Sequence, residues 1–308
     1  MITLSVVSPV YQAQTSVPIL VSRIKHALAS LPVTYEIILV DDRSQDASWR
    51  AIQDECLNSS NVRGLRLSRN FGQHAAITAG LKISTGDWVV VMDCDLQDRP
   101  EQIPHLLEVA LKGHDVVHAR RVLRRDSGIK KLYSAFFYSI FSFLTSTQQD
   151  ATIANFGIYK RNVIEAILSM GDHIRYFPAM VQWVGFNPTS IDVEHSTRYS
   201  GVSSYTLLKM IRLAINTIIS FSDKPLKIVA QVGLILSFIS ICIGLFFLAG
   251  SIAGFVTVPG YASIIVSIWL TAGINIFVLG IVGIYVGKAF ELIKGRPIYI
   301  VDEVAGCD

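Results

Sequence analysis

The chain has 308 residues and a formal net charge of +3, but its 27 Lys and Arg and 24 Asp and Glu residues are unevenly distributed. None of them lies in the sixty residues 228–287. This uncharged block excludes a purely soluble protein, and the composition of the remainder excludes disordered and collagen-like chains. The small, dispersed net charge does not favour nucleic-acid binding. Four scattered cysteines without a CxxC pair indicate neither a disulfide framework nor a structural zinc site.

Short β-branched runs alternate with helical segments in the first hundred residues. The predicted strands are 4–10, 35–42 and 87–93, and apolar spacing predicts helices at 17–31 and 49–57. This alternation indicates an α/β fold with βαβ units and a mainly parallel sheet. Such sheets bind ligands beyond the carboxyl ends of their strands. Two of these strands end in acidic residues, at 41–42 and 93–95, so we expect the ligand at that edge.

Asp93 and Asp95 are two residues apart in an extended segment, so their carboxylates point the same way. Two such carboxylates can converge on one hard divalent cation, Mg²⁺ or Mn²⁺, or on a cation and a ribose. A cation there would bridge the phosphates of a nucleotide and neutralise the charge of a leaving diphosphate. The alternative is a solvated loop that caps a helix.

A basic cluster precedes a stripe of apolar and aromatic residues. The stripe follows helical spacing and consists of Ile129, Leu132, Tyr133, Phe136, Phe137, Ile140, Phe141 and Leu144. This pattern predicts an amphipathic interfacial helix at about 129–146. Arg120, Arg125 and Lys130 belong to the cluster, and we expect them to meet anionic headgroups and an acceptor's phosphate. The alternative is a helix packed on the sheet beside a solvated basic loop.

The membrane region follows a second stripe, which predicts an interfacial helix at 205–225. Within the uncharged block, 228–250 and 262–287 each exceed the roughly 20 residues that span a ~30 Å hydrocarbon core. Basic residues flank the block and are absent from its central loop, so both ends should be cytoplasmic. The alternative is a pair of buried core helices. We expect a catalytic domain at 1–204, a multi-pass membrane hairpin within 226–290, and a cytoplasmic tail at 291–308.

Ordered motifs along the chain carry a family resemblance. They are VVSPVY at 6–11, VDDRSQD at 40–46, SRNFGQHAAITAGL at 68–81, VMDCDLQD at 91–98, NFGIYKR at 155–161, GVSSY at 201–205, GIYVG at 283–287 and RPIYIV at 296–301. Together they resemble the family 2 glycosyltransferases of the GT-A fold, specifically the polyisoprenyl-phosphate sugar transferases, which include dolichol-phosphate mannose synthase and bactoprenol glucosyl transferases. The resemblance implies a Rossmann-like GT-A domain, a nucleotide-sugar donor, a divalent metal, a polyprenyl-phosphate acceptor and inversion at the anomeric carbon. Bacterial relatives favour UDP-glucose or a UDP-N-acetylhexosamine as donor and an inner-membrane location.

The resemblance also implies roles for individual residues. Pro9, Tyr11, Asp42 and Asp93 would contact the nucleotide-sugar, Asp93, Asp95 and Gln97 would form the metal and diphosphate site, and Arg198 and Ser203 would contact a phosphate. Alternatives remain open at several positions. Pro9 and Tyr11 also suit a turn, Asp42 a cap on the following helix, and Arg198 an exposed surface charge.

The catalytic base is predicted at Asp150, and Asp95 is the second candidate catalytic residue. Asp150 matches a family aspartate if two residues of 150–155 are a local insertion, and the alternative is a loop or helix-cap aspartate. Two segments depart from the family pattern. Relatives have Asn-Glu where this chain has Gln12-Ala-Gln14, and many have Asp-Phe-Arg where it has Asn155-Phe-Gly157.

The predicted product is a polyprenyl-phosphate sugar for cell-surface glycan assembly or modification. One alternative is a processive polysaccharide synthase, although Gln182-Trp183 lacks the arginine of that group's Gln-x-x-Arg-Trp motif. Another is a non-catalytic membrane scaffold or flippase subunit. Gly280, Gly283 and Gly287 permit close helix contacts, and the resemblance makes a homodimer or tetramer plausible.

Overall fold

The computed structural model describes residues 2–121, 153–172, 175–193, 224–253 and 260–306. The chain forms two compact units. The first contains residues 1–143, 147–211 and 297–308, and the second contains 144–146 and 212–296. The predicted interfacial helix at 129–146 and all but the last two residues of the one at 205–225 lie outside the described residues.

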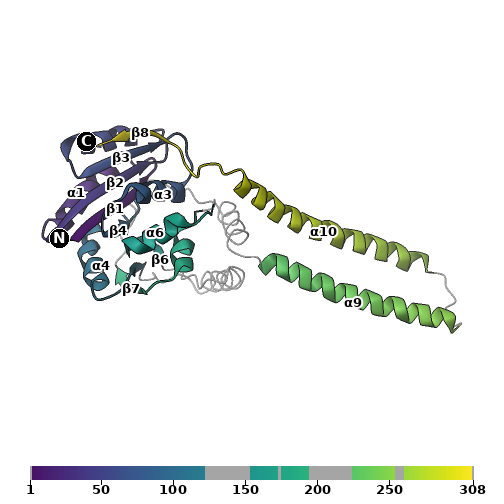
Figure 1. The fold of residues 1–308 in the computed structure, drawn as a ribbon. Helices are drawn as coiled ribbons and strands as arrows, with labels where there is room; N and C mark the ends of the chain where they lie inside the picture. Colours follow the sequence, from purple (N-terminus) through teal and green to yellow (C-terminus); the bar gives the residue numbers. More distant parts are fainter. Residues whose placement is uncertain (1, 122–152, 173–174, 194–223, 254–259, 307–308) are drawn as a thin grey trace, which may run out of the picture. The chain divides into compact units, whose positions relative to one another are not determined.

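Within the described part of the first unit, the centre is an eight-stranded mixed sheet (Figure 1). Its strands are β1 (Ile2–Val10), β2 (Val33–Asp41), β3 (Val62–Leu67), β4 (Trp88–Val91), β5 (Val116–Arg121), β6 (Ile153–Lys160), β7 (Pro188–Val193) and β8 (Val301–Ala305). They are ordered β7-β5-β6-β4-β1-β2-β3-β8. Neighbours from β4 to β3 are parallel, whereas β6 and β8 run antiparallel to the strands beside them.

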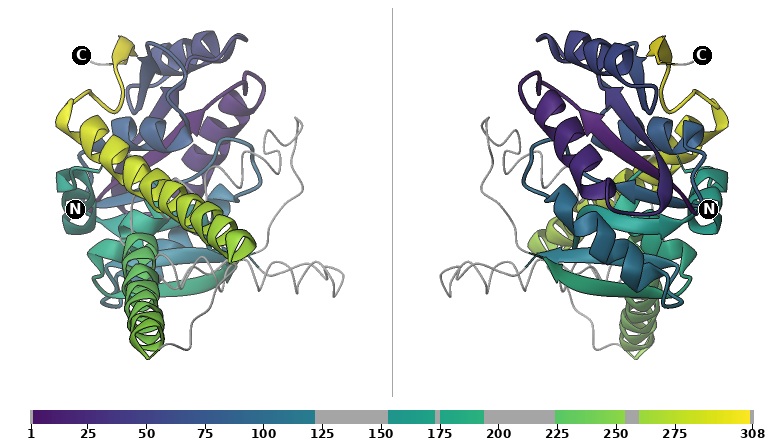
Figure 2. Two further views of the ribbon diagram at one scale, coloured as in Figure 1. Left: turned by 90° about the vertical axis from the view of Figure 1, so that its right-hand side faces the viewer. Right: turned by 90° about the vertical axis from the view of Figure 1, so that its left-hand side faces the viewer.

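Helices cover both faces of the sheet, and alternate side chains of each strand therefore face different helices. One face carries α1 (Ser16–Leu28), α2 (Ser48–Asn58), η1 (Pro100–Gln102) and α4 (Ile103–Ala110), and the other carries α3 (Gln73–Ile83), α6 (Arg161–Ser169) and α7 (Phe177–Val184). In the right-hand view of Figure 2, α1 and α4 lie in front of the sheet. On the opposite face, a Cβ added to Gly80 would collide with Val7. Glycine at that position lets α3 lie directly against β1.

The predicted α/β architecture with a central sheet is confirmed. The predicted strands 4–10, 35–42 and 87–93 correspond to β1, β2 and β4, and the predicted helices correspond to α1 and α2. The sheet is more mixed than predicted, because β6 and β8 are antiparallel to their neighbours. The prediction of a simple tail at 291–308 also missed a strand, since Val301–Ala305 pairs with β3 as β8.

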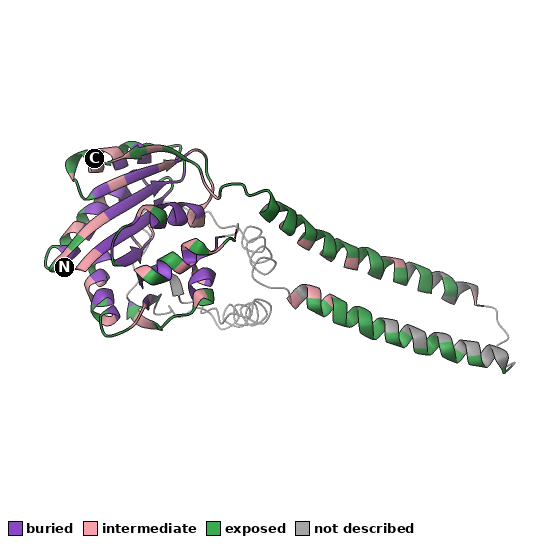
Figure 3. Cartoon of the chain, in the orientation of Figure 1, coloured by how far each residue is buried: buried purple, intermediate pink, exposed green. Residues whose placement is uncertain are grey.

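The second unit contains two long helices, α9 (Lys224–Ile252) and α10 (Tyr261–Ile293), which include the predicted spans 228–250 and 262–287. Figure 3 shows that both are largely exposed where burial is described. Among the described residues, Leu270–Phe290 is long and apolar enough to cross a membrane, and α9 contributes a shorter apolar segment, Leu226–Leu236. By length and composition, α10 is therefore a candidate span, and the two-span hairpin stays a prediction.

Candidate functional site

The carboxyl ends of β1, β2 and β4 lie at one edge of the sheet, because these strands are parallel neighbours. Backbone hydrogen bonds extend the pairing into the loops. The amide of Asp42 donates to the carbonyl of Val10 (2.9 Å), and that of Met92 donates to the carbonyl of Val7 (3.1 Å). The acidic loops after β2 and β4 therefore share an edge with the loop after β1, as the sequence predicts.

The loop after β1 presents a tyrosine at this edge. Pro9 is buried inside β1, whereas Tyr11 is 42% exposed. Gln12 has a positive φ of 51°, and its amide donates to Oγ of Ser44 in the neighbouring loop (3.0 Å). The turn is thus fixed to the loop after β2, and of Pro9 and Tyr11, both predicted nucleoside contacts, Tyr11 is the one open to solvent.

Asp42 is buried and accepts two backbone hydrogen bonds. The amides of Phe71 and Gly72 donate to its two carboxylate oxygens at 2.7 and 2.9 Å. Burial raises the pKa of Asp42 to about 6 despite these bonds, and the neighbouring charge of Asp41 adds to the rise. Asp42 therefore holds the turn that precedes α3, rather than capping the helix that follows it in sequence.

Asp93 is held by two amide side chains that the sequence analysis did not place beside it. Nε2 of Gln73, the first residue of α3, donates to Oδ1 of Asp93 at 2.7 Å. Nδ2 of Asn155, on β6, lies 3.5 Å from the same oxygen. Both residues lie inside family motifs, but only the fold reveals that they converge on Asp93.

Asp95 faces a tight turn. Its Oδ1 accepts a hydrogen bond of 3.1 Å from the amide of Gln97, and Leu96 between them has a positive φ of 62°. The thiol of Cys94 is hydrogen-bonded to the backbone of Tyr11, and burial raises the pKa of the thiol to about 12. The thiol is therefore protonated and serves to join the loops after β1 and β4.

The donor set fits a hard divalent cation. The structure contains, among its described residues, no group of three or more His, Cys, Asp and Glu side chains suited to a metal. Magnesium in nucleotide sites characteristically takes one or two protein carboxylates and fills its remaining positions with phosphate oxygens and water. Asp93 and Asp95, both partly exposed at the edge, match that requirement.

Two histidines near the edge are partly buried and neutral. Nδ1 of His74, in the first turn of α3, accepts a long hydrogen bond of 3.5 Å from the amide of Phe177. His118, on β5, packs edge-on against Tyr159 with ring centroids 5.9 Å apart. Burial lowers the pKa of each imidazole to about 4. Neither is protonated near neutral pH, so both act there as packing groups.

The predicted phosphate-binding residues are only partly described. Arg120 lies on β5, and its Nε donates to Oδ1 of Asp192 on β7 at 2.6 Å. This exposed ion pair joins the guanidinium of Arg120 to the neighbouring strand of the sheet. The other predicted phosphate residues and the predicted base lie outside the described residues. They are Arg125, Lys130, Asp150, Arg198 and Ser203.

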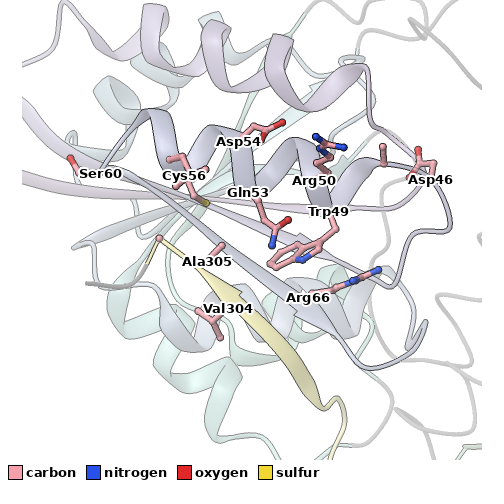
Figure 4. A pocket seen from close by; sticks show the side chains of 13 residues that line it. Asp46, Trp49, Arg50, Gln53, Asp54, Cys56, Ser60, Arg66, Val304 and Ala305 are labelled. Carbon is pink, nitrogen blue, oxygen red and sulfur yellow. The ribbon is translucent and has the colours of Figure 1, made fainter.

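A groove of about 1130 Å³ lies between α2 and β8, and Figure 4 shows its lining. Trp49, Arg50 and Arg66 contribute to it, but it contains none of the predicted site residues. The candidate site is therefore the carboxyl edge, where the predicted acidic side chains meet.

The sequence matches the family model "Glycosyl transferase family 2" over residues 5–168. The chain belongs to glycosyl transferase family 2. Most of the matched region belongs to the described α/β domain and includes its acidic edge. Relatives of this family 2 transferase also align outside the matched region.

Three relatives align over nearly the full length of the transferase. An uncharacterized glycosyltransferase of Synechocystis sp. is 32% identical over 100% of this chain and 97% of its own. The undecaprenyl-phosphate 4-deoxy-4-formamido-L-arabinose transferase of Aeromonas hydrophila is 31% identical over 97% and 93%. The prophage-derived bactoprenol glucosyl transferase of Shigella flexneri is 30% identical over 97% of each chain. These alignments include the apolar helices as well as the sheet.

A solved structure shares the fold. Glucosyl-3-phosphoglycerate synthase from Mycobacterium tuberculosis, in complex with Mn²⁺ and UDP, has a TM-score of 0.50. It is 15% identical, and the alignment covers 71% of this chain and 78% of that one. The match supports a GT-A-like architecture for the sheet and its helices.

Proposed function

We propose that this family 2 transferase moves a sugar from a nucleotide-sugar to a polyprenyl phosphate, with inversion at the anomeric carbon. The observation that carries the proposal is the placement of Asp93 and Asp95 beside Asp42 at one sheet edge. Near-full-length relatives named for undecaprenyl phosphate and bactoprenol support the acceptor class. Relatives named as transferases also favour an enzyme over the scaffold alternative.

Asp93 and Asp95 would hold Mg²⁺ or Mn²⁺. The cation would neutralise the charge that develops on the leaving diphosphate. Gln73 and Asn155 orient Asp93 from two elements, so that carboxylate is fixed before the donor arrives. The exposed ring of Tyr11 is available to the nucleoside. Asp42 holds the adjoining segment in place through the hydrogen bonds that it accepts from the amides of Phe71 and Gly72.

The reaction is a single displacement at the sugar's anomeric carbon. An oxygen of the acceptor phosphate forms the new bond as the bond to the diphosphate oxygen breaks, and the nucleoside diphosphate leaves with the electron pair. An ionised phosphate needs positioning more than deprotonation, so a base assists without being essential. We assign that assistance to Asp150, and phosphate contacts to Arg125, Lys130, Arg198 and Ser203.

The acceptor's chemistry requires a membrane. A polyprenyl chain stays in the bilayer, so the sheet edge must work at its surface. Leu270–Phe290 of α10 satisfies the length and hydropathy of a span. We propose that α9 crosses as well, which gives a hairpin with both ends in the cytoplasm, and that 129–146 and 205–225 lie at the interface. We further propose an inner-membrane location and assembly as a homodimer or tetramer.

The donor is proposed to be UDP-glucose or a UDP-N-acetylhexosamine. The two relatives are named for the transfer of different sugars, glucose and 4-deoxy-4-formamido-L-arabinose, so family membership does not identify the sugar. A panel of nucleotide-sugars labelled in the sugar would identify it.

The test is lipid labelling by the purified full-length protein with undecaprenyl phosphate. One donor should move label into the organic phase, a chelator should abolish the transfer, and Mn²⁺ or Mg²⁺ should restore it. NMR of the product should show inverted anomeric configuration. A folded protein that labels no lipid from any donor in the panel would overturn the proposal.

A further inference from the structure

β8 follows the long apolar helices in sequence, yet it completes the sheet that carries the candidate site. It pairs antiparallel with β3, and the carbonyl of Ile300 accepts a hydrogen bond of 2.9 Å from the amide of Ser68. At the other end, Gly306 has a positive φ of 72°, and a Cβ there would collide with the carbonyl of Val62. The segment is therefore held to β3 at both ends, with one register shift between Arg66 and Leu67.

Glu303, in the middle of β8, accepts two hydrogen bonds. Nη1 of Arg66 donates to Oε1 at 2.8 Å, and Nε1 of Trp49 donates to Oε2 at 2.8 Å. The guanidinium of Arg66 also lies 5.9 Å from the centroid of the Trp49 ring, and Figure 4 shows both side chains beside β8. Arg66 is thus held in one orientation by a carboxylate and an aromatic ring.

Arg66 in turn faces the loop after β2. Its Nε lies 3.3 Å from Oδ2 of Asp41, a carboxylate with no exposed surface, and the two atoms form an ion pair without hydrogen-bond geometry. A buried charge needs such a partner, because its desolvation is otherwise uncompensated. Oδ1 of Asp41 accepts the amide of Ser44 at 3.1 Å, and Oγ of Ser44 accepts the amide of Gln12 at 3.0 Å. The chain of contacts runs from β8 to both loops that flank the proposed nucleoside site.

We infer that Glu303 is a positioning residue for donor binding, acting through Arg66 and Asp41 on the loops that carry Asp42 and Tyr11. The ligand's identity rests on the proposed function. A side chain of β8, distant in sequence from the nucleotide motifs, thus sets the order of those loops.

A positioning role differs from a general contribution to stability. The Glu303–Arg66 pair is half-exposed, with 42% of the Glu303 side chain open to solvent, and ion pairs that solvent reaches contribute little to global stability. Glu303→Gln should therefore leave the melting temperature nearly unchanged while loosening one loop. The matched control is Glu108→Gln on α4, which removes an exposed contact of 2.8 Å to Lys112; this helix packs against β5 and β6, several strands away from β8.

The experiment compares full-length wild type, Glu303→Gln and Glu108→Gln by hydrogen exchange and by steady-state kinetics. In Glu303→Gln, amides at 42–46 should exchange faster, and the donor KM should rise roughly three- to tenfold, as expected for a lost hydrogen bond. The acceptor KM should stay unchanged. Arg66→Lys, which keeps the charge but loses the fork geometry, should give the same pattern, and the double variant should be no worse than the worse single one.

Unchanged exchange at 42–46 together with an unchanged donor KM in Glu303→Gln would overturn the inference. Equal effects of Glu303→Gln and Glu108→Gln would overturn it as well. Failure of the proposed function gives a different result, because wild type would then transfer no sugar, while the exchange comparison would still decide whether Glu303 orders the loops.

Discussion

Gln73 and Asp93 are joined by a hydrogen bond of 2.7 Å, although they lie on different elements. Gln73 begins α3, and Asp93 follows β4. The close approach of α3 to β1 at Gly80 sets the height of this helix over the sheet and thereby brings the amide within reach of the carboxylate. The packing of a helix thus orients a proposed metal ligand.

Gln73→Ala should weaken the binding of the metal ion and also reduce turnover. A hydrogen bond to a charged group contributes about 1.5–3 kcal/mol, so its loss should reduce turnover roughly tenfold or more. The Mn²⁺ concentration for half-maximal transfer should rise, because Asp93 would no longer be fixed. Titration of Mn²⁺ in the lipid-labelling assay measures both. Gln53→Ala, on α2, is the control, and an identical Mn²⁺ response in the two variants would contradict the assigned role.

Asp95→Asn should reduce turnover by at least about a hundredfold, because the carboxylate acts on charge that develops in the transition state. Membrane insertion and the melting temperature should not change, since Asp95 lies in a partly exposed loop. Asp54→Asn, at an exposed position on α2, should be fully active. Turnover equal to that of wild type in Asp95→Asn would contradict the assignment of the metal site to this edge.

The raised pKa of Asp42, about 6, predicts a pH-dependent donor affinity. Below that value Asp42 takes up a proton and can no longer accept fully from the amides of Phe71 and Gly72, so the donor KM should rise as pH falls from 7 to 5. The contribution of Asp42 to the free energy of unfolding changes with pH in the opposite sense: it is more favourable at low pH. Between its ordinary pKa of 3.8 and about 6, the carboxyl keeps its proton in the folded chain and loses it in the unfolded chain, so Asp42 favours unfolding as pH rises through this range. Kinetics from pH 5 to 8 should show a flatter donor KM in Asp42→Asn. Parallel profiles in both proteins would assign the titration to another group.

Acid should destabilise the sheet domain through His118. Its folded pKa of about 4 lies below the ordinary histidine value of 6.5, so the unfolded chain binds a proton that the partly buried ring does not. Stability from this group is present above pH 6.5 and is lost as pH falls towards 4. His118→Phe, which keeps a ring against Tyr159, should flatten that part of the melting-temperature profile. His26→Gln, at an exposed position on α1, should not. A profile as steep in His118→Phe as in wild type would contradict this assignment.

Periodicity predicts the centre of the fold and leaves its edges unassigned. β1, β2 and β4 are short runs rich in β-branched residues, a composition typical of strands. β8 is five residues long and contains Asp302 and Glu303, so nothing local distinguishes it from a polar tail. It becomes a strand because Glu303 and its neighbours pair with β3, more than two hundred residues earlier in the chain.

The candidate site shows the same division. Asp42, Asp93 and Asp95 could be placed at one edge because parallel neighbours end together, a rule that needs only strand order. Their partners could not be predicted. Asn155 lies 62 residues from Asp93, and only the packing of β6 against β4 brings its amide within 3.5 Å of that carboxylate. Spacing within a motif predicts ligands, whereas tertiary contacts select what orients them.

β8 is synthesised after both long apolar helices, and this order has a consequence for biogenesis. While the ribosome is still producing α9 and α10, the outer side of β3 has no partner strand and Arg66 lacks the carboxylate of Glu303. Nascent chains that stall inside the apolar region would therefore expose an open sheet edge, a surface prone to pairing with other chains. Ordering of the loops at the proposed donor site is in this way delayed until translation has passed the hydrophobic segments.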